Sequence, residues 1–252
     1  MKFILFFIIC NLSFATRVIL LDPGHGGEEL GAMSHVWIKK KGSSKTKNIY
    51  EKDLALKLAK KVKSLVSKKY TTYLTRSFDR TVTLDQRAHM ADTVKADIFV
   101  SIHFNSSTNK KYRGFETYYL DNHKNKAIKK VEKIENKSLS GSDKVVNQIL
   151  IDLVIQKTVP SSKKLAKNIH KQLAKNIGKK FKFKDRGIKP GLFYVLALSK
   201  RPGVLIEAGF MSNPSELKIV QKEAYLNAYA KSIARGIESY LASLPPKDVP
   251  LF

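Results

Sequence analysis

The chain has 252 residues and a formal net charge of +26, from 47 lysine and arginine residues against 21 aspartate and glutamate residues. A hydrophobic fraction of 43% is enough for a folded core and excludes wholesale disorder. The positive charge favours anionic polymers or surfaces as partners. The lysines nevertheless alternate with aliphatic residues, as on the solvent face of a helix, and no nucleic-acid-binding motif accompanies them. We therefore expect no nucleic-acid partner.

The first fifteen residues, MKFILFFIICNLSFA, have the pattern of a secretory signal peptide. Lys2 supplies the positive end, an apolar stretch follows, and Ser13 to Ala15 form a small-x-small cleavage pattern. The apolar stretch is too short to span a membrane, and we expect no membrane span after its removal. The mature protein, residues 16–252, is then expected in the periplasm or cell envelope. The only cysteine, Cys10, would leave with it. Any metal site must then use His, Asp and Glu.

From residue 18 onward, short apolar runs alternate with helical patterns, which is typical of an α/β layered domain. Strands are predicted at Val18–Leu21, Tyr70–Leu74, Ile98–His103, Gly114–Leu120 (more edge-like), Phe193–Ala197 and Gly203–Glu207. Helices are predicted at Glu51–Val66, Leu84–Val94, Lys163–Ile177 (capped by Ser161 and Ser162) and Ala224–Leu244. The polar stretch Glu28–Asn48 is predicted to be an exposed loop. Residues Asn122–Pro160 interrupt the alternation with helical spacing, which indicates one catalytic domain with an inserted helical segment.

Four residues with acid or base side chains stand at the ends of these elements. His25, His103 and Glu207 close apolar strands, and Glu51 opens the first helix. Strand C-termini and helix N-termini lie on the same side of an α/β sheet, so the four could converge. Two imidazoles and one carboxylate suit Zn²⁺ with a position left for water, and another carboxylate could move protons.

Each of these residues also has a structural interpretation. His25 could make only a local bond in its Gly-rich turn, His103 could be satisfied by backbone, and Glu51 could complement the helix dipole. Glu207 is harder to explain this way, because a carboxylate at the end of a buried strand is costly unless it is paired or functional. The remaining histidines, expected to be exposed or satisfied, are His35, His89, His123 and His170.

Four motifs in order resemble the zinc-dependent N-acetylmuramoyl-L-alanine amidases of the type-3 cell-wall group. They are VILLDPGHGG, YEKDLALKLAKKV, LTRSFDRTVTLDQRAHMAD with ADIFVSIHFNSS, and PGVLIEAGFMSNPSE. The resemblance implies a three-layer α/β/α sandwich around a mostly parallel mixed sheet. It also implies hydrolysis of the amide between N-acetylmuramic acid and L-alanine of peptidoglycan. The implied zinc ligands are His25, Glu51 and His103, and Glu207 is the implied catalytic carboxylate.

Two further site assignments concern contacts with a substrate. Asn105 and Arg76 are possible substrate contacts, although Arg76, like Arg87, is more simply read as pairing with acids near the rim. The stretch between His25 and Glu51 is longer than is usual in the family. Glu28 and Glu29 lie closer to His25 than Glu51 does, but neither opens an apolar helix.

Some members of this family, mostly those that split the division septum, carry an inserted helix that blocks the site until an activator displaces it. The segment Asn122–Pro160 lies in the corresponding place. The resemblance implies Glu135, or as second choice Glu132, as the blocking zinc ligand, and an activator protein as partner. The alternative is a surface helical hairpin with a structural face. The candidate docking face consists of Val145, Val146, Ile149, Leu150, Leu153 and Val154.

The leading interpretation is therefore an exported, monomeric zinc amidase that remodels the cell wall or separates daughter cells. A catalytically silent envelope-binding protein of the same fold is the alternative. The complete set of four acid and base residues argues against this alternative.

Overall fold

The computed structural model describes residues 16–40, 43–136 and 143–247, with the side chains of 38–40, 43–44 and 143–149 left out of the description. The predicted signal peptide, residues 1–15, lies outside the described residues. No helix in the described part of the chain is both long and apolar enough to cross a membrane.

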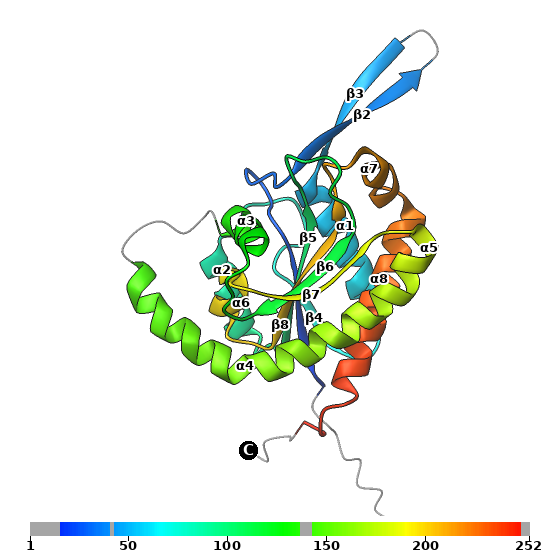
Figure 1. Ribbon diagram of the computed structural model, residues 1–252. Coiled ribbons are helices and arrows are strands. Elements are labelled where there is room, and N and C mark those ends of the chain that lie inside the picture. The colour runs from blue at the N-terminus through cyan, green and yellow to red at the C-terminus, as the bar shows by residue number, and fades with distance from the viewer. Residues whose placement is uncertain (1–15, 41–42, 137–142, 248–252) are drawn as a thin grey trace, which may run out of the picture.

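A six-stranded mixed sheet forms the middle layer of the protein (Figure 1). The strand order is β4-β1-β5-β8-β6-β7, and all neighbours are parallel except β6 and β8. This confirms the predicted α/β sandwich around a mostly parallel mixed sheet. The strands are β1 (Val18–Pro23), β4 (Thr71–Leu74), β5 (Ile98–Asn105), β6 (Phe115–Leu120), β7 (Asp185–Gly191) and β8 (Gly203–Phe210).

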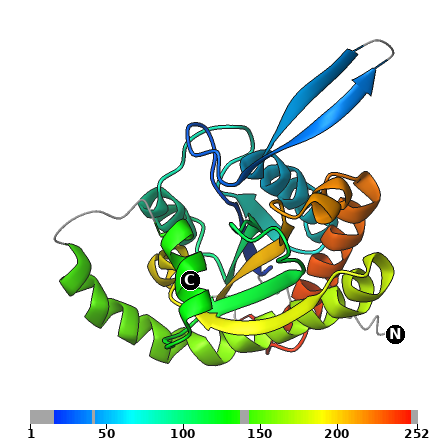
Figure 2. The ribbon, with the colours of Figure 1, turned by 45° about the horizontal axis from the view of Figure 1, so that its top comes forward.

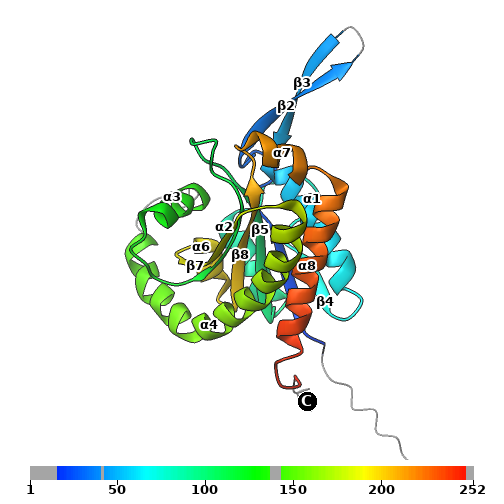
Figure 3. The ribbon, with the colours of Figure 1, turned by 45° about the vertical axis from the view of Figure 1, so that its right-hand side comes forward.

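Helices cover both faces of the sheet and form two hydrophobic clusters with it (Figures 1 and 3). One cluster contains residues of α1, α8 and the C-terminal part of α4, and the other contains residues of α2, α3, α6 and the N-terminal part of α4. Helix α4 therefore contributes to both layers. The helices are α1 (Glu51–Val66), α2 (Leu84–Thr93), α3 (Lys126–Glu135), α4 (Asp143–Leu173), the π-helix η1 (Ala174–Gly178), α5 (Lys179–Phe181), α6 (Tyr194–Ser199), α7 (Pro214–Val220) and α8 (Glu223–Leu241).

The predicted exposed loop over Glu28–Asn48 is wrong for most of its length. Strands β2 (Met33–Lys40) and β3 (Ser43–Tyr50) pair there as an antiparallel hairpin that projects from the body (Figures 1 and 2). Lysine and serine have low strand propensity, so their abundance concealed the strands. The hairpin is anchored at its base, where Ile49 is buried and Val36 packs against the core.

Two strand predictions are also corrected by the structure. The apolar run Phe193–Ala197 forms helix α6 rather than a strand, because so short a run has no decisive periodicity. Strand β6 is not an edge strand, since β7 pairs on its outer side and all six β6 residues are buried. Glycine and Pro190 concealed β7 from sequence analysis, and an edge is where a sheet tolerates proline.

The predicted helix boundary after Pro160 is wrong, because α4 continues through this proline. Ser162 does not cap a helix there; its Oγ accepts a hydrogen bond of 3.0 Å from the backbone N–H of Gly203. The inserted segment and the following core helix are therefore continuous. Helical structure in the insert is confirmed by α3 and by the first half of α4.

A buried ion pair holds the turn after β1. The carboxylate of Asp22 pairs with Arg87 and accepts hydrogen bonds of 2.7 Å each from Thr75 Oγ1 and Ser101 Oγ. Burial raises the pKa of Asp22, but the Arg87 charge and these hydrogen bonds outweigh it, so the pKa lies below its usual value. Arg87 Nη2 also donates to the carbonyl oxygen of His25 at 3.0 Å. This confirms the structural interpretation of Arg87.

We expect Asp22→Asn to lower the free energy of unfolding by about 3–5 kcal/mol at pH 7, because it leaves the Arg87 charge buried without a counterion. A group whose pKa is depressed by folding stabilises the protein above its ordinary pKa of 3.8 and loses that effect as the pH falls through the folded value. The difference between wild type and variant should therefore shrink below about pH 4. Urea unfolding at several pH values measures this.

The matched control is Arg201→Gln, which breaks the pair between Arg201 and Asp92, whose side chains are 30% and 46% exposed. An exposed pair of this kind should contribute less than about 1 kcal/mol. Equal losses of stability in the two variants would contradict the role given to Asp22.

Candidate metal centre

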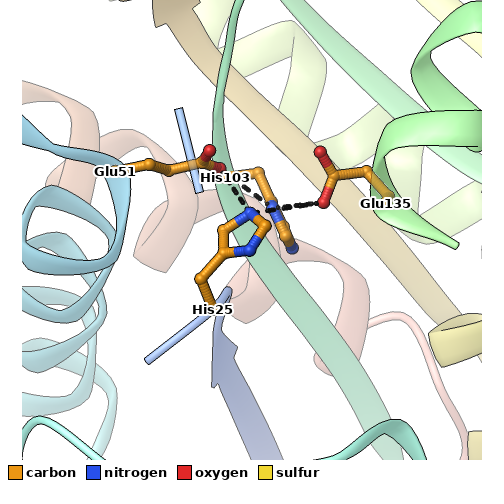
Figure 4. Close-up of side chains that lie close together, drawn as sticks. All are labelled: His25, Glu51, His103 and Glu135. Carbon is orange, nitrogen blue, oxygen red and sulfur yellow. Dashed lines mark hydrogen bonds and ion pairs between the residues drawn. The ribbon is translucent and has the colours of Figure 1, made fainter. Parts of the chain in front are cut away.

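Four side chains from separate elements meet at the rim where the strands end (Figure 4). His25 follows β1, Glu51 is the first residue of α1, His103 lies on β5, and Glu135 is the last residue of α3. Each offers one ligand atom, and these atoms all lie within 4.8 Å of one another. The convergence of His25, Glu51 and His103 is as the sequence predicted.

Both carboxylates of this cluster, Glu51 and Glu135, lie close to both imidazoles. Glu51 Oε1 lies 3.2 Å from His25 Nε2 and 3.0 Å from His103 Nδ1. Glu135 Oε2 lies 2.9 Å from His103 Nδ1 and 3.5 Å from His25 Nε2. Among the described residues, His25 Nε2 is a buried atom with no hydrogen-bond partner, which is expected of a nitrogen that faces a ligand.

The glycines around His25 are required by close approach. A Cβ atom at Gly24 would lie 2.3 Å from the His103 ring, and one at Gly31 would lie 2.6 Å from both Glu51 Oε2 and His25. Gly31 also has a φ of +67°, which side chains rarely adopt. His25 itself has a φ of 56°, so the turn holds its imidazole in an uncommon backbone conformation.

Glu51 is fixed by backbone donors as well as by the imidazoles. Its Oε2 accepts a bond of 2.7 Å from the N–H of Ala32, and its Oε1 accepts one of 3.0 Å from the N–H of Phe104. Burial raises the pKa of Glu51, but the charge of His25 and the hydrogen bond and charge of His103 outweigh it, so the pKa lies below its usual value and the carboxylate stays ionised. Glu28 and Glu29 are absent from the cluster of metal-binding side chains found in the described part of the chain.

The carboxylates of Glu51 and Glu135 shift the pKa values of the two histidines. Burial lowers the pKa of His25, but Glu51 outweighs it and the pKa lies above the usual value. Burial likewise lowers the pKa of His103, and Glu135 and Glu51 raise it well above the usual value. A site that holds protons this firmly has strong negative potential, and a divalent cation would compete for the same atoms.

Glu207 lies beside this cluster, because β5 and β8 pair with His103 opposite Glu207. Its side chain is 1% exposed, and its Oε2 has no hydrogen-bond partner among the described residues. Burial and then the charge of Glu135 raise the pKa of Glu207 well above its usual value. Strand β6 places a second buried carboxylate, Glu116, opposite Glu207 on the other side.

A cleft of about 490 Å³ opens beside the cluster. Helix α3 forms one wall through Val131, Ile134 and Glu135, and Asn105 lines the other side. The Nδ2 of Asn105 is buried without a partner in the described structure, on a residue that lines this cleft.

Arg76 is differently placed. It is 1% exposed and donates to the backbone carbonyls of Pro23, Gly24 and Lys52 at 2.8–3.1 Å. These contacts support the structural interpretation of Arg76 over a substrate contact.

The remaining predictions concern side chains outside the cluster. Glu132, the second choice for a blocking ligand, instead lies 2.5 Å from His123 Nε2 and accepts a hydrogen bond from the N–H of Leu192. His170 lies 2.9 Å from Thr117 Oγ1 and 2.7 Å from Asp185. His35 and His89 are exposed. The interpretation of these four histidines as exposed or satisfied is confirmed.

The family model for N-acetylmuramoyl-L-alanine amidases matches residues 19–239 of the chain. The chain belongs to the N-acetylmuramoyl-L-alanine amidase family. It is 32% identical over 234 residues to the amidase AmiA of Escherichia coli K12, covering 89% of this chain and 76% of AmiA. It is 31% identical to AmiC of Escherichia coli O6:H1, covering 89% of this chain but only 53% of AmiC, so it spans about half of that relative.

A solved amidase from Clostridium difficile 630 has the same fold. The TM-score is 0.67 at 30% identity, over 91% of this chain and 99% of that one. The enzyme class of this family member is that of an amide hydrolase, and its His and Glu cluster is consistent with a zinc site. The ligand types fit, since zinc accepts His nitrogen and carboxylate oxygen at about 2.0–2.2 Å.

We expect the wild-type protein to bind one zinc ion. Glu51→Ala should weaken that binding by at least about 100-fold, because loss of a residue that only hydrogen-bonds to a ligand typically costs about 10–100-fold. Elemental analysis and a competitive chelator titration measure stoichiometry and affinity. Glu29→Ala is the matched control, because Glu29 lines the cleft but lies outside the cluster. If Glu29→Ala lost zinc and Glu51→Ala kept it, the ligand assignment would be wrong.

Proposed function

We propose that this protein is an exported zinc amidase that cleaves the bond between N-acetylmuramic acid and L-alanine in peptidoglycan. The cluster of His25, Glu51 and His103 beside Glu207 carries the proposal. Residues 1–15 would direct export to the periplasm or cell envelope, which agrees with a family that acts on cell walls. A catalytically silent binding protein would have no need of an unpaired buried glutamate next to two imidazoles.

The side chains divide the chemistry between them. Zinc held by His25, Glu51 and His103 would supply a Lewis acid that polarises the amide carbonyl and activates water. Glu207 takes a proton from the attacking water at its carboxylate and delivers it to the departing amine nitrogen. Burial and the charge of Glu135 raise the pKa of Glu207 above that of an ordinary carboxyl, which favours the proton-carrying form that delivers the proton to the amine. Asn105 would orient the substrate through its free amide.

Glu207→Ala should retain one zinc ion and lose about 10²–10⁴-fold in turnover, the usual contribution of a general acid–base residue. Mass spectrometry of digested peptidoglycan measures this directly, because wild type should release stem peptides that begin at L-alanine. Chelator should abolish the release. Turnover within a few-fold of wild type in zinc-loaded Glu207→Ala would rule out the role of this carboxylate.

We further propose that α3 inhibits the enzyme and that the protein acts in daughter-cell separation under control of an activator. The position of Glu135 supports inhibition, since its carboxylate faces both imidazoles from the side of the cleft. Side-chain bonds hold α3 in this place: Asn136 donates to the carbonyl of Leu192 at 2.8 Å and accepts from the N–H of Tyr194 at 3.0 Å.

The proposed docking face for the activator lies on α4. Leu150 and Leu153 are 51% and 56% exposed, which supports a partner there. Val154 instead packs against the second hydrophobic cluster. The other members of this face lie in the stretch whose side chains are outside the description.

Glu135→Ala should raise hydrolysis of peptidoglycan by about tenfold, equivalent to removing ~1.4 kcal/mol of inhibitory contact. This substitution is a sharper test than deleting the segment, because α4 continues into the core. Lys133→Ala is the matched control, since Lys133 is exposed on the same helix. Hydrolysis rates are compared at equal zinc occupancy. Unchanged or lower activity in Glu135→Ala would contradict autoinhibition.

A further inference from the structure

The β2–β3 hairpin has two chemically different faces. Directly paired residues of an antiparallel ribbon share a face, and Met33 pairs with Tyr50, His35 with Asn48, and Trp37 with Thr46. We call the face formed by these residues the Trp37 face; its members are Met33, His35, Trp37, Thr46, Asn48 and Tyr50. The opposite face packs on the body at its base, where Ile49 is buried.

The Trp37 face leaves large side chains in water. Trp37 is 70% exposed and Met33 is 62% exposed, and His35, Thr46 and Asn48 are exposed beside them. A two-stranded ribbon is only marginally stable in water. Exposed aromatic surface on such a ribbon is unfavourable, and a bound partner that covers this surface would stabilise the ribbon. From Met33 to Trp37 the face is about 13 Å long at ~3.3 Å per residue.

The base of the hairpin is part of the metal centre. Strand β3 continues directly into Glu51, and Ala32, just before β2, donates its N–H to that carboxylate at 2.7 Å. Gly31 and Ala32 also line the cleft. The cleft therefore lies at the base of the hairpin, which projects from the body (Figures 1 and 2), and we infer that a polymer with one repeat in the cleft would bring its neighbouring repeats to the ribbon.

We propose that the Trp37 face binds the glycan strand of peptidoglycan next to the bond being cleaved; this rests on the proposed function. Pyranose rings present apolar C–H faces that pack on aromatic rings, and their hydroxyl and acetamido groups pair with His, Asn and Thr side chains. The charge of the ribbon as a whole suits the same polymer; the pairing places Lys45 and Lys47 on the face opposite Trp37, where they would meet stem peptides rather than sugar rings. Residues 30–50 contain five lysines and no acidic residue, and the stem peptides of peptidoglycan carry carboxylates.

A lipid bilayer fits this ribbon less well. An inserting hairpin needs an apolar end, whereas the sequence from Lys39 to Lys47, KKKGSSKTK, holds no aliphatic or aromatic residue. The neighbours of Trp37 on its own face are polar. The glycan strand is therefore the occupant that the observations favour.

Binding to purified sacculi tests the proposal, with Glu207→Ala in every protein so that the sacculi remain intact. Trp37→Ala should weaken binding about tenfold, as expected when an aromatic anchor is removed. Trp37→Phe should restore most of it, because the ring is retained. Tyr73→Ala is the matched control, a 44% exposed aromatic on β4. With Glu207 intact, the control Tyr73→Ala should cleave a short soluble muropeptide within about twofold of wild type.

Trp37 is the only tryptophan, so its fluorescence reports on the hairpin directly. Sonicated, soluble peptidoglycan should shift its emission to the blue, whereas vesicles of phosphatidylglycerol should not. Sacculus binding that is unaffected by Trp37→Ala, or reduced equally by Tyr73→Ala, overturns the proposal. If Trp37→Ala weakened binding to vesicles but not to sacculi, the proposal would be wrong and the face would be a membrane-binding surface. Ring-dependent sacculus binding by a protein that releases no stem peptides would refute the proposed hydrolysis and support this inference.

Discussion

The carboxylate of Glu51 is the group on which the rim of this protein depends. Its two oxygens accept from the N–H groups of Ala32 and Phe104 and face both His25 and His103. A buried carboxylate is tolerated only when such partners satisfy it, and the first turn of a helix adds a favourable dipole. One side chain thus joins the end of β1, the base of the hairpin, the start of α1 and the end of β5.

Sequence patterns predicted the parts of the fold that have strong periodicity. The buried strands β1, β5 and β8 and the helices α1, α2 and α8 were all predicted with small errors at their ends. The errors fall where local composition and tertiary context disagree. The hairpin is built from lysine and serine, β7 contains glycine and proline, and α4 passes through Pro160 because packing on both layers outweighs the cost of proline.

Most of the candidate site was also predictable from the sequence, because the geometry of a parallel sheet determines where strand ends lie. A parallel sheet brings strand ends together, so His25, His103 and Glu207 could be grouped from the sequence alone. Glu51 could be added because it opens a helix. The position of Glu135 followed only from resemblance to a family, because no periodicity relates the end of α3 to a strand rim.

Two segments flank this rim, the β2–β3 hairpin and helix α3, and they are attached to the body with different strength. The hairpin base is fixed through the buried Ile49 and the Glu51 carboxylate. Helix α3, in contrast, has Ile128 as its one buried residue. Partly buried Val131, side-chain hydrogen bonds and the contacts of Glu135 with the imidazoles supply the rest of its anchorage.

Burying one isoleucine contributes about 1.5–3 kcal/mol, and each hydrogen bond contributes about 1 kcal/mol. Releasing α3 should therefore cost far less than opening the sheet on which the ligands lie. A helix held in this way can uncover a rigid site without disturbing it. Under the proposed inhibition, the same fold would carry both a fixed catalytic centre and a movable cover, since the candidate ligands lie at strand ends and on a core helix while α3 is held mainly by contacts at the surface.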